Sequence, residues 1–225
     1  MCRHVNFLGG SPLNRLSWLR PSTSFLNAVL ASKDTRWIVF QSGKPLVKLT
    51  PGSKESVLAR LPTTDVRALL GPSPVFGQGK EPGATHEASA HSLEAARLHG
   101  PPIVFLGAHE PEGLDITSAL PSTEFSASED PDLLVAKLHG IPYFALDAGN
   151  SSEDELKSLV TDSSEAKIGE GYLEFVEPRS ASSNFSFFEA GVFAEARSML
   201  DWNARNRVEF QRMDFITNIM RSIRI

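Results

Sequence analysis

The chain has 225 residues, of which 41% are hydrophobic and 22% are charged, a composition typical of a globular protein. Its formal net charge of −5 excludes the strongly basic character that draws proteins to nucleic acid by electrostatics alone. The only cysteine, Cys2, excludes an intrachain disulfide and a four-cysteine zinc site, so a reducing compartment is expected.

The N-terminal segment is poor in acidic residues, because the first one along the chain is Asp34. Before it come Arg3, Arg15, Arg20 and several serines, a composition found in mitochondrial transit peptides. The alternative, which we favour, is that this segment belongs to the folded domain. A secretory signal is not expected, because Arg15 and Arg20 interrupt any apolar core, and no stretch reaches the ~20 apolar residues that span a bilayer.

Five short apolar runs predict β-strands. In chain order they cover residues 37–40, 46–49, 103–106, 141–146 and 172–176. The first run is continuous and apolar, as expected for a strand that is buried on both faces. The spacer 41–45 contains one glycine and predicts a hairpin loop of moderate length between the first two strands. Pro142 restricts the fourth strand, because proline is tolerated only at its first positions or on a sheet edge.

Helical signals lie between and after these strands. They cover residues 24–31, 64–70, 92–98 and 187–207. Ser22 or Thr23 is available to cap the first helix, and Gly71 followed by Pro72 stops the second. The last helix gives the strongest signal, because residues of one face recur at three-and-four spacing. These residues are Phe188, Val192, Ala196, Met199, Leu200 and Asn203.

Mixed strands and short helices predict an α/β (α+β) domain. We expect a mixed β-sheet that is flanked by short helices and closed by the long helix 187–207. Two segments rich in Pro, Gly, Ser and acidic residues, about 71–100 and 110–131, predict long loops. The predicted organisation is one domain over residues 1–207 and a separate tail over residues 208–225.

Two glycine-containing stretches invite comparison with phosphate-binding loops, and both lack the required context. Gly77-Gln78-Gly79 with Gly83 does not have the GxGxxG spacing. No predicted strand precedes this stretch, and no predicted helix follows it directly. Gly43-Lys44-Pro45 lacks the earlier spaced glycine and the Ser/Thr of a Walker motif. Both stretches are therefore interpreted as ordinary loops.

Titratable residues are a third type of candidate site. His86 and His91 lie in one loop without metal-binding helical spacing, and His109-Glu110 with Asp115 follows a predicted strand. An enzyme of unknown type that uses His109, Asp115 or Asp147 is an alternative, but no nucleophile–base pair or metal set supports it. A GxSxG motif is missing from the sequence. Two sequons, at Asn150 and Asn184, are expected to stay unmodified because no secretory signal is expected.

Several stretches in a fixed order carry a family resemblance. They are FLGGSPLNRLSWLR (7–20), WIVF with GKPL (37–46), VFLG (104–107), YFALD (143–147), and AGVFAEAR leading into LDWNARN (190–206). Together they resemble the N-terminal domain of the NADH pyrophosphatases, the zinc-ribbon branch of the Nudix hydrolases, in particular the fungal forms. The resemblance covers roughly residues 5–207, and it assigns Arg15 and Arg20 to the folded domain.

The resemblance implies a function for the family. Its members cleave the pyrophosphate of NADH or NAD⁺ to a nicotinamide mononucleotide and AMP, and related members remove NAD caps from RNA. They combine this N-terminal domain with a zinc ribbon and with a Nudix domain that binds Mg²⁺ or Mn²⁺. Many are homodimers and several are peroxisomal, so the resemblance implies a cytoplasmic or peroxisomal location, with mitochondria as the alternative.

The sequence departs from the family after Arg207, where the first zinc ligands would follow and Val208 stands instead. Nudix chemistry needs several carboxylates that hold divalent cations against the diphosphate, and its motif contains Arg-Glu and Glu-Glu pairs. Neither dipeptide occurs in this sequence. We therefore expect a truncated family member that is inactive alone, and we assign it no catalytic, cofactor-binding or metal-binding residue.

The tail offers the alternative function of a non-catalytic interaction or dimerisation module. Apolar residues with interspersed arginines predict an amphipathic helix over 208–225 that binds a partner or a membrane surface. The expected partners are a second copy of the chain or a full-length homologue, and no nucleic acid.

Overall fold

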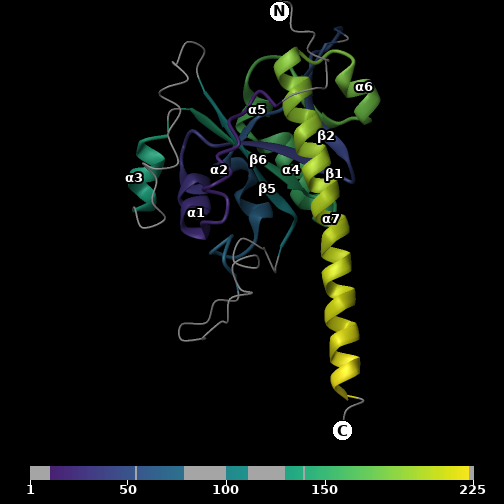
Figure 1. Ribbon diagram of the computed structural model, residues 1–225. Helices are drawn as coiled ribbons and strands as arrows, with labels where there is room; N and C mark the ends of the chain where they lie inside the picture. The colour runs from purple at the N-terminus through teal and green to yellow at the C-terminus, as the bar shows by residue number, and fades with distance from the viewer. Residues whose placement is uncertain (1–10, 54, 79–99, 111–129, 139, 223–225) are drawn as a thin grey trace, which may run out of the picture.

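The structure is a computed structural model that describes residues 11–53, 55–78, 100–110, 130–138 and 140–222, with the backbone alone from residue 206 onward. Figure 1 shows a central sheet with helices on both sides and a long C-terminal helix that extends past it. The strands are β1 (Arg36–Gln41), β2 (Lys44–Leu49), β3 (Ser56–Leu58), β4 (Leu61–Pro62), β5 (Ile103–His109), β6 (Ile141–Asp147) and β7 (Tyr172–Phe175). The helices are α1 (Thr23–Ala31), α2 (Thr63–Val66), the 3-10 helix η1 (Arg67–Leu70), α3 (Pro131–Ala136), α4 (Glu153–Asp162), α5 (Ser164–Lys167), α6 (Pro178–Ser182) and α7 (Phe187–Ser222).

The sheet is mixed, as the sequence predicts. Its strand order is β3-β2-β1-β6-β5, with β4 added to β1 and β7 added to β2. The central strands β1 and β6 run parallel, with Arg36 opposite Tyr143 and Phe40 opposite Asp147, while β5 pairs antiparallel with β6. The two central strands therefore bring their C-terminal ends, Gln41 and Asp147, to the same edge of the sheet.

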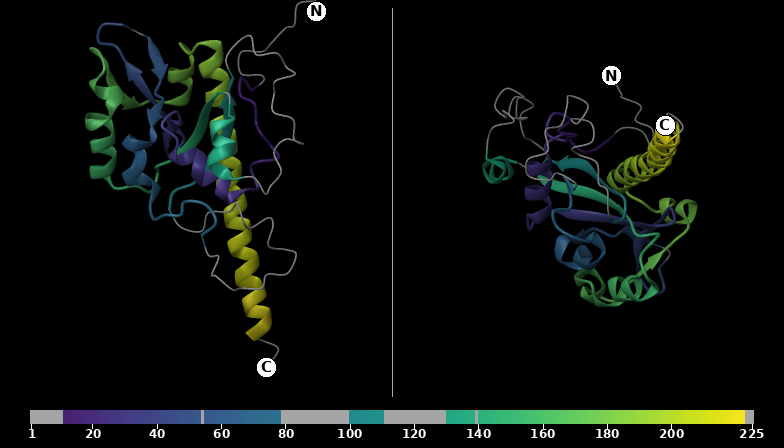
Figure 2. Two further views of the ribbon diagram at one scale, coloured as in Figure 1. Left: turned by 90° about the vertical axis from the view of Figure 1, so that its left-hand side faces the viewer. Right: turned by 90° about the horizontal axis from the view of Figure 1, so that it is seen from below.

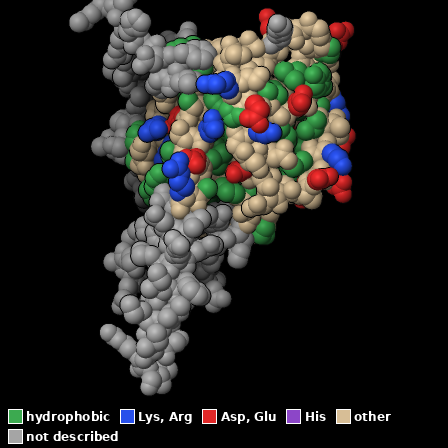
Figure 3. Space-filling model, turned by 90° about the vertical axis from the view of Figure 1, so that its right-hand side faces the viewer, with side chains coloured by type: hydrophobic (Ala, Val, Ile, Leu, Met, Phe, Trp, Pro, Cys, Tyr) green, Lys and Arg blue, Asp and Glu red, His purple; other side chains and the backbone are tan. Residues whose placement is uncertain are grey.

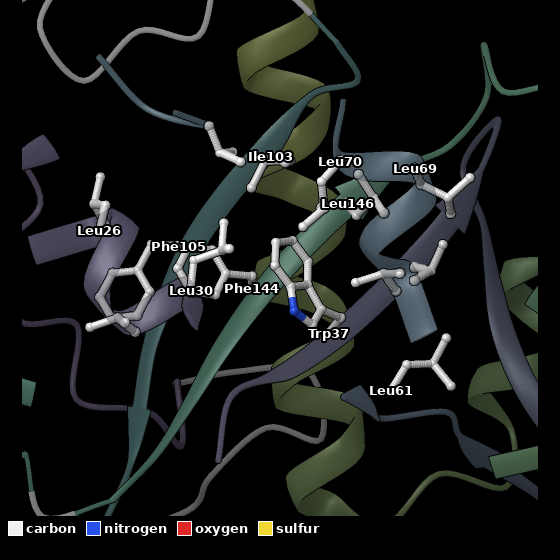
Figure 4. Close-up of a cluster of buried hydrophobic side chains, with 14 of the residues drawn as sticks. Leu26, Leu30, Trp37, Leu61, Leu69, Leu70, Ile103, Phe105, Phe144 and Leu146 are labelled. Carbon is white, nitrogen blue, oxygen red and sulfur yellow. The ribbon is translucent and has the colours of Figure 1, made fainter. Parts of the chain in front are cut away.

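Alternation along β1 and β6 divides the core between the two faces of the sheet. Trp37 and Phe144 face the cluster that α1, η1 and α4 complete, and their rings stack with centroids 4.9 Å apart. Figure 4 shows these two rings between the side chains of the surrounding helices and strands. Phe40 faces the opposite cluster, where it stacks on Phe193 of α7. Figure 2 shows, in the view from below, α7 on one side of the sheet and α2 on the other.

All five predicted strands are confirmed, and the continuous run in β1 is buried on both faces as expected. Pro142 is the second residue of β6 and precedes the first residue that pairs with β1, in agreement with its predicted position. The prediction of a hairpin loop over residues 41–45 is wrong in its length. Gln41 pairs with Lys44, so the turn has two central residues, and both Ser42 and Gly43 adopt the positive φ that such tight turns require.

The helix predictions are confirmed in part. Helix α1 is capped by the Ser22 side chain, and the second predicted helix is a short α-helix that continues as a 3-10 helix. The predicted helix 92–98 lies outside the described residues. The last helix was predicted to end at 207, but α7 continues to Ser222 because the sequence after 207 keeps helical periodicity and holds no Gly or Pro that would stop it.

Residues 11–31 belong to the folded domain. Leu16, Leu19 and Phe25 are almost completely buried within the first core cluster, and Leu13 lies in the second. Asn14 forms two backbone hydrogen bonds with Ala108, which pairs this segment with the outer strand β5. From residue 11 onward this segment is therefore packed against the sheet.

Candidate functional site

The titratable residues singled out from the sequence do not form one site. His109 ends β5 opposite Ile141, the first residue of β6, whereas Asp147 is the last residue of β6. Six residues of strand separate the two ends, which places His109 and Asp147 roughly 20 Å apart. Asp115 lies outside the described residues. The two described members of the predicted set therefore cannot act on one substrate atom.

Each of these residues is engaged locally. The His109 ring meets the Phe188 ring edge-on, with centroids 4.5 Å apart. Glu110, beside it, accepts a hydrogen bond of 2.7 Å from the Asn14 side-chain amide. The Asp147 carboxylate accepts a hydrogen bond of 3.0 Å from the Gly149 backbone N–H.

Gly77 and Gln78 lie in a loop, as predicted, whereas Gly43 lies in the hairpin turn and Lys44 and Pro45 begin β2. Gly77 has a positive φ, and a side chain there would meet Thr23 of α1 at 3.2 Å, so the residue serves close packing. Lys44 belongs to the β1–β2 hairpin, where its amino group lies 3.0 Å from the Glu177 carboxylate. Gly79, Gly83, His86 and His91 lie outside the described residues. Among the residues that are described, no three His, Cys, Asp or Glu side chains gather as a metal site would require.

Among the residues that the structure describes, two acidic side chains are buried, and the sequence alone did not reveal them. Glu189, in the first turn of α7, accepts hydrogen bonds from the backbone N–H groups of Ser186 and, 131 residues earlier in the chain, Leu58. It thereby satisfies an orphan N–H at the helix start and one on the strand β3. The pattern Ser-x-x-Glu at residues 186–189 predicts the local half of this arrangement, whereas the contact with Leu58 has no local signal.

The second buried acid, Glu195, fixes the N-terminal segment to α7. It forms an ion pair of 3.0 Å with Arg15 and accepts a hydrogen bond from the Ser11 hydroxyl. Arg20 lies nearby, donates to the Leu106 carbonyl at 2.7 Å, and has its pKa lowered, chiefly because burial disfavours its charged form. Both buried carboxylates are thus occupied by groups of the same domain.

A cavity of about 640 Å³ opens at the edge of the sheet where β1 and β6 end. One wall is the tight turn of Ser42 and Gly43 together with Asp147, and the other wall is the face of α7 that carries Arg197, Asp201 and Arg205. We call this cavity the hairpin–α7 groove. Its lining residues come from three segments, near residues 42, 147 and 200, so no local sequence pattern predicts the groove.

The surface charges are mixed. On the face drawn in Figure 3, basic and acidic side chains alternate with apolar ones, and neither charge forms a broad area. Such a face lacks the basic stripe that gives nucleic-acid-binding proteins their electrostatic footprint. The absence of a nucleic-acid partner nevertheless stays a prediction.

The comparisons with known proteins bear on most of the chain. A family model described as "NUDIX-like: NADH pyrophosphatase-like rudimentary NUDIX domain" matches residues 34–202. This range begins just before β1 and ends within α7, so it contains the whole sheet and both walls of the groove except its last residues. No curated protein matches the chain.

Proposed function

Because the chain belongs to the family of NADH pyrophosphatase-like rudimentary NUDIX domains, we propose that it is a non-catalytic module that does not hydrolyse NADH by itself. The observation that carries this proposal is the use of its two buried carboxylates, Glu189 and Glu195. Glu189 accepts hydrogen bonds from backbone N–H groups, and Glu195 contacts a hydroxyl and a guanidinium, all from the same domain.

Diphosphate hydrolysis of the Nudix type has a different requirement. Several carboxylates on one helix and its loop must be open to divalent cations, which bridge and polarise the diphosphate. In the described part of the chain no three acidic side chains gather as a metal site would require, and the full sequence has neither Arg-Glu nor Glu-Glu. These features support a role in folding and assembly rather than in chemistry.

The test is direct. Purified chain is incubated with NADH and either Mg²⁺ or Mn²⁺, and AMP is measured by chromatography, with a full-length family enzyme as the positive control. We expect no AMP above the no-protein control. AMP that forms in proportion to protein concentration and disappears with EDTA would overturn the proposal.

A second candidate function follows from the length of α7. The helix runs without interruption from Phe187 to Ser222, and Figure 1 shows its C-terminal part extending past the sheet. The sequence of that part has apolar residues at helical spacing, including Val208, Ile216 and Ile219. We propose that this arm binds a second copy of the chain or a full-length homologue through a helix–helix contact.

One experiment distinguishes pairing through this arm from binding of the arm to a membrane. Within the described residues no helix is both long and apolar enough to cross a bilayer. The full chain is compared with a version ending at Arg207 by light scattering after gel filtration and by co-sedimentation with anionic liposomes. We expect a larger, concentration-dependent mass only for the full chain, and equal pelleting of both. Equal masses of the two versions would contradict pairing through the arm. Pelleting of the full chain alone would show that the arm binds lipid.

For location we propose the cytoplasm or the peroxisome, with mitochondria as the alternative. Because Leu16 and Leu19 are core residues, a leader that is removed after import would have to end before residue 11. Sequencing the N-terminus of the protein isolated from cell fractions distinguishes these locations. A mature chain that begins beyond residue 11 would contradict the proposal.

A further inference from the structure

The hairpin–α7 groove lies where open sheets with parallel strands place their ligands. Phe40, the penultimate residue of β1, pairs with Asp147, the last residue of the parallel strand β6, and both line the groove. In such sheets, ligands bind in the crevice beyond the carboxyl ends of the strands. The cavity volume of about 640 Å³ is also within the range of small-molecule sites.

The α7 wall of the groove carries an excess of positive charge. Arg197, Asp201 and Arg205 follow one another at intervals of four residues, and so lie on the same face of the helix. Asp201 forms an ion pair with Arg205. Arg197 is exposed and forms no ion pair within the described part of the chain. Its planar guanidinium is suited to bind a phosphate through two parallel hydrogen bonds.

The opposite wall carries a fixed carboxylate. One oxygen of Asp147 accepts the Gly149 N–H at 3.0 Å. A side chain at Gly149 would come within 3.1 Å of the same carboxylate oxygen and 3.4 Å of the Ser42 hydroxyl, so the missing side chain lets this loop approach the turn closely. Asp147 is partly exposed, and its second oxygen is available to accept hydrogen bonds from a ligand.

These two walls exclude a simple anion and favour a bifunctional ligand. Asp147 repels phosphate alone, whereas a carboxylate at this place in an α/β sheet accepts hydrogen bonds from sugar hydroxyls. We infer that the groove binds a phosphorylated sugar, with the phosphate on Arg197 and the sugar hydroxyls on Asp147. The hydroxyls of Ser42 and Ser198, which also line the groove, supply further hydrogen bonds. This site is independent of whether the chain hydrolyses NADH.

The probe for this inference is D-ribose 5-phosphate, titrated into the ¹⁵N-labelled full chain and followed by NMR. Inorganic phosphate and free ribose form the two comparison arms. With ribose 5-phosphate we expect saturable chemical-shift changes at residues 42, 43 and 147–149. Inorganic phosphate and free ribose should each bind at least tenfold more weakly. Inorganic phosphate that binds as tightly as the sugar phosphate would overturn the assignment to Asp147, and no saturable shift at 10 mM probe would overturn the site.

Three variants locate the contacts. Arg197→Ala should weaken the binding of ribose 5-phosphate at least tenfold, because it removes the phosphate ligand. Asp147→Asn should weaken it about fivefold and at the same time improve the binding of inorganic phosphate, since the repulsion is lost. The matched control is Arg60→Ala, which removes an exposed arginine outside the groove and should change nothing. Equal affinities of Arg197→Ala and Arg60→Ala, with the NMR spectrum of the folded protein retained, would refute the inference.

Discussion

The starts of α4 and α7 carry the same four-residue cap in two different environments. In α4 the Ser152 N–H donates to Glu155 at 2.9 Å, and the Glu155 N–H donates back to the Ser152 hydroxyl at 3.3 Å. In α7 the corresponding distances between Ser186 and Glu189 are also 2.9 and 3.3 Å. Each arrangement is a capping box, in which two orphan N–H groups at a helix start are satisfied reciprocally.

The difference between the two caps lies in the second oxygen of the glutamate. Glu155 is fully exposed, and its hydrogen bonds stay within its own helix start. Glu189 is buried, and its second oxygen accepts the N–H of Leu58 at 3.1 Å. The same motif therefore caps only the start of its own helix in α4, while in α7 it also joins the helix to the strand β3. Burial decides whether the cap is a local or a tertiary contact.

The largest expected effect comes from removing the buried carboxylate. Glu189→Ala leaves the buried Leu58 N–H without its acceptor and removes the carboxylate half of the α7 capping box, so we expect a loss of about 3 kcal/mol in the free energy of unfolding. Urea denaturation measures it. Glu155→Ala, the same change at the same motif position, is the control and should be much less destabilising. Comparable losses for the two variants would show that the Leu58 contact contributes nothing.

A conservative change sharpens the comparison. Glu189→Gln keeps the shape and one acceptor oxygen, but its NH₂ group then faces either Leu58 or Ser186, which are both donors. We expect a loss of roughly 2 kcal/mol, between that of the alanine variant and the wild type. Glu155→Gln should leave the unfolding curve almost unchanged, because water replaces the lost acceptor. A Glu189→Gln variant as stable as the wild type would mean that only shape, and not charge, is needed at this position.

The serine halves of the two caps should respond alike. Ser186 and Ser152 are both exposed, and each hydroxyl accepts only the N–H of its own glutamate among backbone donors. Replacing either by alanine should lower the free energy of unfolding by about 1 kcal/mol. Denaturant titrations of the two variants, which differ only in the helix concerned, test this equality. A Ser186→Ala effect as large as that of Glu189→Ala would move the tertiary contribution from the carboxylate to the hydroxyl.

The caps also show how much of the fold the sequence could predict. Apolar runs such as 37–40 and 141–146 predicted the central strands, because a strand that is buried on both faces needs every side chain to be apolar. The Ser-x-x-Glu pattern at 152–155 would have predicted the start of α4, which the search for apolar periodicity did not find. Strands β3 and β4 were missed because three and two residues are too few to show a period.

The features that the sequence could not predict are contacts between residues far apart in the chain. Nothing around Glu195 indicates that Arg15, 180 residues earlier, forms an ion pair with it. The hairpin–α7 groove likewise combines a turn near residue 42, the end of β6 and a helix near residue 200. Local patterns determine where strands and helices begin and end, whereas the pairing of charges across them follows from packing.

The smallest expected effect is the pH dependence of the exposed cap. Hydrogen bonds from the Ser152 backbone N–H, and then from its hydroxyl, lower the pKa of Glu155 below its ordinary value of 4.5. A carboxyl group with a lowered pKa stabilises the folded state fully above the unfolded value, and this stabilisation is lost as the pH falls through the folded value. NMR titration of the Glu155 side-chain carboxyl carbon measures the pKa directly. Ser152→Ala should raise it toward 4.5 because it removes the hydroxyl donor. Ser186→Ala, made at the other cap, should leave the Glu155 pKa unchanged, so a shift in that variant would show that the two caps are coupled.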